Sequence, residues 1–149
     1  NVSKSCVRVA RLFGFDPKVA FLSHSTFGKP ISKNTRHVRD AIQKLKKEKV
    51  DFDFDGEMQP DVALNPIYQE IYPFSKIVGN ANILIMPALH SAAISTKLMK
   101  VFGGGKLIGP LLIGLGLPIE VAPLRASTSE ILNLASIASY SSGIIDYSN

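Results

Sequence analysis

Two carboxylates, Asp55 and Glu57, flank a single glycine near the middle of the chain. Side chains of this type and spacing could serve as a general acid and a general base. They could also accept hydrogen bonds from the backbone of a turn and cap the helix that follows. We favour the structural role, because neither a nucleophile nor a metal-ligand partner stands out in the sequence.

The residues around these carboxylates predict a strand, a turn and a short helix. Residues 50–54 alternate apolar and acidic side chains, which is the period-2 pattern of a strand with one buried face. Gly56 is expected to end this strand, and Pro60 suits the first position of a helix, where no backbone N–H is needed. The turn would then lie at the carboxyl end of a strand, where ligands bind in open α/β sheets.

The other polar candidates are dispersed along the sequence. Arg125 precedes a predicted helix N-terminus, whose free N–H groups favour a phosphate or a carboxylate. A solvated surface arginine is the alternative. His24, His37 and His90 are scattered, and no cysteine or second histidine stands at metal-ligand spacing. No metal site is therefore predicted.

Helical and extended patterns alternate along the chain. Strands are predicted at residues 18–22, 50–54, 82–86, 107–115 and 119–121. Helices are predicted near residues 6–13, after a cap at Asn34 or Thr35, at 61–64, at 66–71, at 94–102 and from Ser127 onward. The helix after the cap at Asn34 or Thr35 is expected to bury a stripe of Val38, Ala41, Ile42 and Leu45. The run 82–86 lacks alternation, which is typical of a central strand covered on both faces. This order predicts an α/β fold with a mostly parallel sheet between two helical layers.

Composition narrows the class of protein. With 149 residues, 46% of them hydrophobic, the chain can bury a core as one domain. The net charge is +5, but the basic stretch 36–49 lacks aromatic side chains for stacking on bases, so no nucleic-acid partner is predicted. The apolar runs are too short to cross a bilayer. The single cysteine, Cys6, allows no internal disulfide and favours a cytoplasmic location. Because the chain begins at Asn1 within an amphipathic pattern, we expect a piece of a longer protein.

Three ordered blocks of the sequence carry a family resemblance. Residues 55–65 read Asp-Gly-Glu-Met-Gln-Pro-Asp-Val-Ala-Leu-Asn, residues 82–97 read Asn-Ile-Leu-Ile-Met-Pro-Ala-Leu-His-Ser-Ala-Ala-Ile-Ser-Thr-Lys, and residues 104–115 contain Ile-Gly-Pro-Leu-Leu. The blocks resemble those of phosphate acetyltransferases. They resemble still more closely the C-terminal domain of large bacterial NADP-dependent malic enzymes. The signature residues are Asp55, Gly56, Glu57, Gln59 and Asp61.

The resemblance implies a two-lobed, isocitrate-dehydrogenase-like fold that is incomplete at its N-terminus. Residues 1–103 would form the second lobe, and residues 104–149 would return to the first lobe. The predicted strands between 107 and 121 would then lack their natural neighbours and leave an open edge. A dimer contact is the expected cover, so the resemblance also implies a homo-oligomer.

The segment 118–131 tests whether transferase chemistry is retained. The matching segment of phosphate acetyltransferases resembles Pro-Val-Asn-Asp-Leu-Ser-Arg-Gly-x-Ser-x-x-Asp-Ile, whose Ser-Arg pair and later Asp serve the reaction. Matched without gaps, these three positions are Pro123, Leu124 and Glu130. Leucine cannot hold the phosphate charge of the transition state, and Arg125, one residue later, points elsewhere. We therefore predict that transferase activity is lost, as it is in the malic-enzyme domains.

Glu130 has a structural explanation as well. With Ser127 it completes a Ser-x-x-Glu capping box, which satisfies free backbone donors at the start of a helix. We favour this capping role over ligand binding.

Three function classes remain open. The first is a regulatory and oligomerising domain of an NADP-dependent malic enzyme, which converts malate to pyruvate and CO2, with acetyl-CoA bound as an effector. The second is a fragment of an active phosphate acetyltransferase, which makes acetyl phosphate and CoA from acetyl-CoA and phosphate. The third is another acyl-phosphate or CoA-binding module.

The malic-enzyme resemblance implies no cofactor in these residues. NADP and a divalent metal, Mg or Mn, would belong to domains upstream. The candidates for binding the effector, chosen by position and chemistry, are Ser91, Lys97, Arg125 and Ser127.

Overall fold

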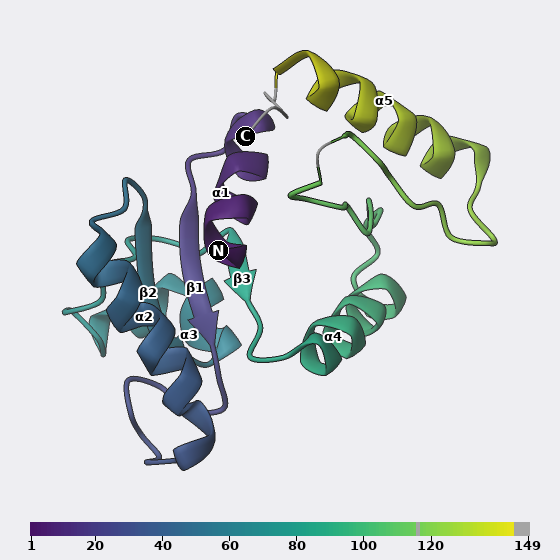
Figure 1. Cartoon of the computed structure of the whole chain (residues 1–149). Helices are drawn as coiled ribbons and strands as arrows, with labels where there is room; N and C mark the ends of the chain where they lie inside the picture. The colour runs from purple at the N-terminus through teal and green to yellow at the C-terminus, as the bar shows by residue number, and fades with distance from the viewer. Residues whose placement is uncertain (116, 145–149) are drawn as a thin grey trace. The chain divides into compact units, whose positions relative to one another are not determined.

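The structure, a computed structural model, describes residues 1–115 and 117–144 and divides into two compact units (Figure 1). Unit 1 is Asn1–Thr96 and unit 2 is Lys97–Asn149. Unit 1 contains, in chain order, α1 (Val2–Leu12), β1 (Lys18–Leu22), η1 (Lys33–Thr35), α2 (Arg36–Glu48), β2 (Asp53–Met58), α3 (Pro60–Leu64), η2 (Pro66–Glu70) and β3 (Ile83–Ile85). Helix α4 (Leu89–Phe102) begins in unit 1 and ends in unit 2, and α5 (Thr128–Ile144) belongs to unit 2.

The sheet of unit 1 is parallel, in the order β2-β1-β3. Strand β1 has the predicted bounds. The prediction that residues 82–86 form a central strand is wrong for the described part of the chain, because β3 lies at an edge and β1 at the centre. The apolar run of β3 still has its physical reason: Ile83 packs in one core cluster and Leu84 against the other, so both faces of the strand are covered.

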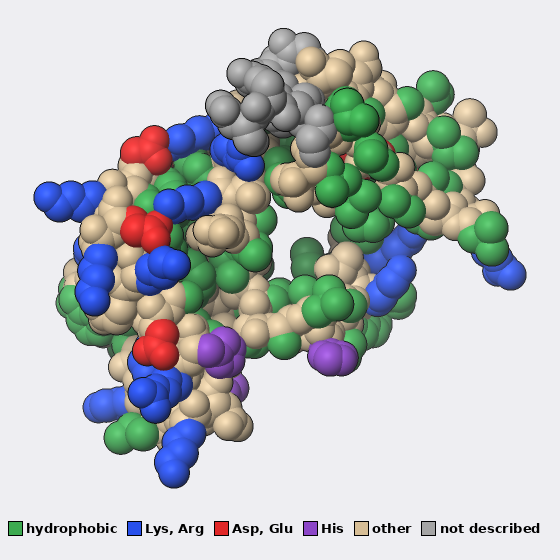
Figure 2. Space-filling model, in the orientation of Figure 1, with side chains coloured by type: hydrophobic (Ala, Val, Ile, Leu, Met, Phe, Trp, Pro, Cys, Tyr) green, Lys and Arg blue, Asp and Glu red, His purple; other side chains and the backbone are tan. Residues whose placement is uncertain are grey.

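Helices cover both faces of this sheet, which confirms the predicted α/β fold class. Val19 and Phe21 of β1 pack with buried residues of α1 and α2, whereas Ala20 and Leu22 pack with Ala63 and other residues that follow β2. The predicted inner stripe of α2 is confirmed at Val38, Ile42 and Leu45, while Ala41 is exposed. Ion pairs from Lys4 to Glu48 (2.6 Å) and from Arg11 to Asp51 (3.0 Å) hold α1 against α2 and the segment after it. Figure 2 shows Lys and Arg side chains spread over this helical side of unit 1.

Strand β2 begins three residues later and ends four residues later than the predicted range 50–54. The expected turn at Gly56 is wrong: Gly56 lies within β2 and is paired with Phe21 of β1. Its φ of +142° is a backbone conformation that side chains rarely adopt, and a Cβ at this position would lie 2.6 Å from the carbonyl oxygen of Phe21. Glycine is therefore required by the close approach of two strands rather than by a turn. Pro60 is the first residue of α3, as predicted.

Unit 2 contains less regular structure than predicted. The strands expected at 107–115 and 119–121 are wrong: in the described part of the chain, these segments share a single isolated bridge, Leu111 to Glu120. Their apolar pattern is that of strands, but a strand forms only where a neighbour supplies hydrogen bonds. Helix α5 begins directly after Ser127, as predicted. Among the described residues, no helix is long and apolar enough to cross a membrane.

Candidate functional site

Glu57, in the signature, is buried and bound by polar partners from two other segments, the loop at residues 23–28 and α2. Only 1% of the residue is exposed, and its Oε1 accepts hydrogen bonds from the Ser25 hydroxyl (2.9 Å), the Gly28 N–H (3.1 Å) and the Arg39 guanidinium (3.1 Å). A buried charge needs such partners, because desolvation otherwise makes it very unfavourable. Glu57 is thus a structural anchor, with one carboxylate oxygen engaged by three donors of the protein itself.

Arg39 extends this network to the start of α2. The same guanidinium donates to the Thr35 hydroxyl (2.7 Å) and to the Ser32 carbonyl (3.1 Å). The sequence does not indicate this role, because Arg39 is one of several cations in the basic stretch 36–49. No local signal in the sequence pairs it with Glu57, 18 residues away.

The other signature residues also bind the protein itself. Asp55 is buried and accepts from the backbone N–H groups of Lys76 (2.8 Å) and Gly56 (2.9 Å). This agrees with the backbone-donor role favoured from the sequence, although neither carboxylate caps α3, which has Gln59 at its N-cap without a side-chain bond. Asp61 is exposed in the first turn of α3.

Gln59 ties β2 to the loop after β1. Its side-chain amide donates to the His24 carbonyl (2.7 Å), and its backbone N–H donates to the Thr26 hydroxyl (3.2 Å). Together with Glu57, it fixes the loop at residues 23–28. The signature therefore positions a loop at the carboxyl edge of the sheet and does not itself present a reactive group.

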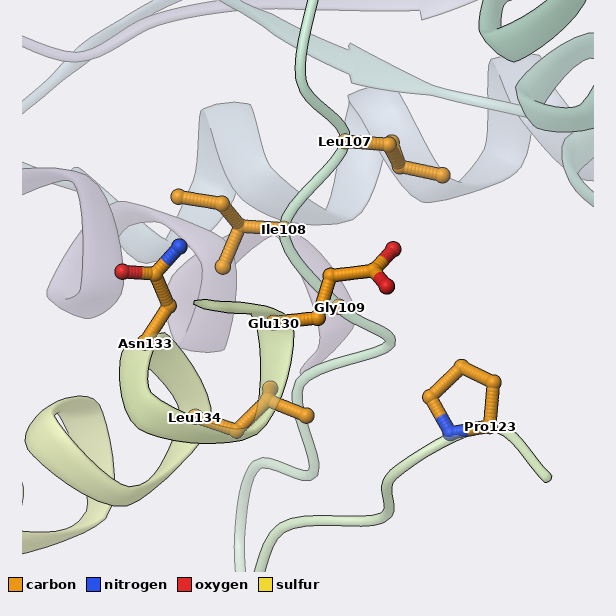
Figure 3. A pocket seen from close by; sticks show the side chains of 7 residues that line it. All are labelled: Leu107, Ile108, Gly109, Pro123, Glu130, Asn133 and Leu134. Atoms are coloured by element: carbon orange, nitrogen blue, oxygen red, sulfur yellow. The ribbon is translucent and has the colours of Figure 1, made fainter. Parts of the chain in front are cut away.

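A second candidate site is a small hollow in unit 2 (Figure 3). Its empty space of about 240 Å3 includes open solvent, so it is a surface hollow and not an enclosed cavity. Its lining residues are Leu107, Ile108, Gly109, Pro123, Glu130, Asn133 and Leu134. The structure thus brings Pro123 and Glu130, two of the three positions matched to transferase chemistry, to one surface. The walls are mainly apolar, and the polar groups are an amide and a carboxylate.

The carboxylate that lines this hollow, that of Glu130, already forms hydrogen bonds with Ser127. Glu130 Oε2 accepts from the Ser127 N–H (2.7 Å) and the Ser127 hydroxyl (2.9 Å), while the Glu130 N–H donates to that hydroxyl (3.3 Å). The predicted capping box is therefore confirmed. The Ser127 N–H, then the Ser127 hydroxyl and then Lys100, whose Nζ lies 3.6 Å from Oε1, hold the pKa of Glu130 below its usual value.

The residues named for effector binding do not form one cluster in either unit. Ser91 lies in unit 1, where its hydroxyl donates to the Ala88 carbonyl (2.8 Å) at the start of α4. Lys97 is exposed on α4, Arg125 is exposed before α5, and Ser127 is in the capping box. Leu124, at the position of the transferase arginine, is fully exposed. Effector binding by these residues stays a prediction.

Neither site contains the groups for metal chemistry. Among residues 1–115 and 117–144, no cluster of three His, Cys, Asp or Glu side chains could hold a metal ion. The polar groups of the hollow are the Asn133 amide and the Glu130 carboxylate, which is already hydrogen-bonded to Ser127. Leu124, which lies outside this lining, offers no cation to stabilise a transferring phosphate.

Comparisons with known proteins place these features in one family. The model of the phosphate acetyl/butaryl transferase family matches residues 1–139. The NADP-dependent malic enzyme of Rhizobium meliloti is 45% identical over 96% of this chain, which spans 19% of that enzyme. The phosphate acetyltransferase of Staphylococcus epidermidis is 35% identical over 92% of this chain, which spans 44% of that protein.

Solved structures agree with the sequence comparisons. The EutD phosphotransacetylase from Staphylococcus aureus has a TM-score of 0.83 and 33% identity, covering 93% of this chain and 44% of that one. A phosphotransacetylase from Streptococcus pyogenes has a TM-score of 0.84 and 34% identity, covering 90% of this chain and 41% of that one. This chain is similar to less than half of each of them. On the family match, the sequence identities and the shared fold, the chain belongs to the phosphate acetyl/butaryl transferase family.

Proposed function

We propose that the chain is a regulatory and oligomerising domain of an NADP-dependent malic enzyme that binds acetyl-CoA and has no acetyltransferase activity. Relatives with that enzyme name are 45% and 37% identical, and the chain spans 19% of each of them. In this proposal, domains outside these residues bind NADP and a divalent metal and decarboxylate malate to pyruvate. The domain functions in the cytoplasm as a homo-oligomer, at least a dimer. Residues 1–103 belong to the second lobe of the fold, and 104–149 return to the first.

The observation that carries the proposal is the conformation of residues 118–131. Glu130 is used in a capping box, Pro123 has no hydroxyl, and Leu124 places an apolar side chain where the transferase pattern has its arginine. Acyl transfer to phosphate requires a preorganised cation at the developing charge. What is left is a surface that can bind a thioester without converting it.

An active phosphate acetyltransferase fragment is the second candidate. The 33–35% identity to phosphate acetyltransferases and phosphotransacetylases favours it. Against it stand the three substituted positions: the Ser-Arg pair of the transferase pattern is replaced by Pro123 and Leu124, and Glu130 at the aspartate position is engaged in the capping box.

Two measurements on the intact parent protein separate these candidates. Isothermal titration calorimetry is expected to detect acetyl-CoA binding, and acetyl-CoA is expected to change the rate of malate-dependent NADPH formation. An assay with acetyl-CoA and phosphate is expected to yield no acetyl phosphate. Acetyl phosphate formation, or an absence of acetyl-CoA binding, contradicts the proposal.

Two variants test whether acetyl-CoA binds at the hollow of unit 2. Asn133→Leu removes its side-chain amide and is expected to weaken acetyl-CoA binding. Ser136→Ala changes an exposed position of the same helix and is expected to leave binding unchanged.

A further inference from the structure

The two faces of the sheet in unit 1 have outer layers of different chemical character. Helices α1 and α2, which pack on one face, carry eight Lys or Arg residues and two acidic ones. On the other face, residues 62–75, which contain α3 and η2, include a single charged residue, Glu70. Solvent therefore meets a basic layer on one side of the sheet and a nearly uncharged layer on the other.

The uncharged layer presents large apolar side chains to solvent. Ala63 and Ile77 of this segment are buried against the sheet, whereas five larger neighbours are between 45% and 71% exposed. Hydrogen bonds keep the segment compact: the Ile71 N–H donates to the Tyr68 carbonyl (3.1 Å), and the Ala81 N–H donates back to the Ala63 carbonyl of α3 (2.9 Å). The exposed side chains of this folded segment are here called the apolar layer (Leu64, Ile67, Ile71, Phe74 and Val78).

The signature residues hold the aromatic end of the apolar layer in place. The ring of Phe74 packs against that of Phe27, from the loop after β1, with the ring centroids 4.9 Å apart. Asp55 Oδ2 accepts from the Lys76 N–H (2.8 Å), two residues after Phe74, and the Glu57 carbonyl accepts from the Phe27 N–H (2.7 Å). Both segments that bring the rings together are therefore tied to β2. A surface that is fixed in advance loses less entropy on association.

The charge pattern favours a second copy of the chain as the partner of this surface. In a two-fold symmetric dimer the same patch is present on both subunits, so charges near the axis face their own kind. Two copies that met through α1 and α2 would bring many cations together, and like charges across an interface repel. The apolar layer avoids this repulsion, because its segment is nearly uncharged. Homodimer interfaces are also more apolar than the remaining surface and enriched in aromatic residues.

We propose that the apolar layer is the surface through which two copies of the chain associate. The inference rests on the proposed function in one respect, the homo-oligomer, and it names the surface that the oligomer uses. This surface lies in unit 1 and differs from the dimer contact that the sequence led us to expect at residues 107–121. Ile67 and Ile71 anchor the contact, and Phe74, supported by Phe27, extends it. Removal of these side chains from water drives the association.

The test measures the mass of the intact parent protein by analytical ultracentrifugation over a range of concentrations. The double substitution Ile67→Asp and Ile71→Asp places like charges opposite each other and is expected to raise the dissociation constant roughly 30-fold or more, the loss typical of hot-spot residues. The matched control is Ile31→Asp, which makes the same change at an isoleucine that is 93% exposed before η1, and it is expected to leave the mass unchanged.

A second variant guards against misfolding. Ile67→Ser with Ile71→Ser introduces no charge, and it is expected to weaken association less than the aspartate pair does. Because both isoleucines are more than 60% exposed, the variants are expected to fold. Far-ultraviolet circular dichroism checks that they do.

The outcomes separate this inference from the proposed function. An unchanged mass in the folded double variants overturns the apolar layer as the interface and leaves acetyl-CoA binding and the homo-oligomer standing. The same result is expected if another domain of the parent protein covers the apolar layer. A wild-type protein that is monomeric at every concentration overturns both the interface and the proposed homo-oligomer. A mass that falls in the double variants but not in Ile31→Asp, in a protein that does not bind acetyl-CoA, supports the interface and overturns the proposed effector role.

Discussion

The two units of the chain differ most in how they bury apolar side chains. Unit 1 has two core clusters, one on each face of its sheet, whereas Leu134 is the one buried hydrophobic residue of unit 2 among the residues described. In unit 2, Ile113 and Leu115 stay about 40% exposed, although their segment is as apolar as a core strand. Apolar composition therefore does not produce a core by itself. A segment needs a hydrogen-bonded neighbour and a covering layer before its side chains can be buried.

Truncating one leucine in each unit gives the largest expected contrast. Leu22→Ala removes a side chain that is 2% exposed and packed on all sides, so it is expected to lower the free energy of unfolding by about 4 kcal/mol. Leu134→Ala, in a site that opens onto a hollow, is expected to cost about 2 kcal/mol. Native-state hydrogen exchange of amides in β1 and α5 measures both. Equal losses would show that unit 2 is as well packed as unit 1.

The buried ion pair of unit 1 is expected to matter nearly as much. Glu57→Ala leaves Arg39 without its carboxylate and removes the partner of Ser25 and Gly28, so a loss of about 3 kcal/mol is expected. The lower end of the usual range applies because Arg39 is partly exposed. The control, Asp40→Ala, breaks an exposed pair and is expected to change stability by less than about 1 kcal/mol. Chemical denaturation compares the two variants.

A third substitution tests the capping box at the start of α5, which is the best-defined polar feature of unit 2. Ser127→Ala removes the hydroxyl that accepts from the Glu130 N–H, and is expected to cost about 1 kcal/mol. Ser136→Ala on the same helix serves as its control. Faster hydrogen exchange confined to the first turn of α5 is the expected signature, and unchanged exchange there contradicts the capping role.

The smallest expected effect is a pH dependence at the same cap. The folded state holds the pKa of Glu130 below its usual value, so this carboxylate contributes stability above its unfolded-state pKa. The contribution is lost as the pH falls through the lowered folded-state pKa. Glu130→Gln is expected to abolish the pH dependence of the protection factors, which are exchange rates corrected for intrinsic amide exchange, in the first turn of α5 over that acidic range. A dependence that persists in the variant would assign it to another group.

Local signals in the sequence predicted local structure well. The sequence predicted the bounds of β1, the inner stripe of α2 and the capping box of Ser127 and Glu130. Each of these features depends on neighbours within a few residues. The errors share a non-local cause. Gly56 was expected to end β2, but the strand continues because Phe21, 35 positions earlier, pairs with it.

In the candidate sites, too, local features could be predicted from the sequence and non-local ones could not. The sequence identified Pro123, Leu124 and Glu130, since they follow one another in a matched motif. It did not reveal the Arg39 anchor, because that ion pair depends on how α2 packs against the sheet. Only the topology brings such residues together.

The close backbone contact at Gly56 shows why membership of a family and catalytic activity must be judged from different residues. Glycine is needed there because two backbones nearly touch, and the flanking Asp55 and Glu57 are engaged with donors of the protein itself. The architecture alone thus gives these three residues a structural role, whether or not a chain that carries them catalyses a reaction. A match to Asp-Gly-Glu identifies a relative, and whether that relative is a catalyst must be decided at other positions.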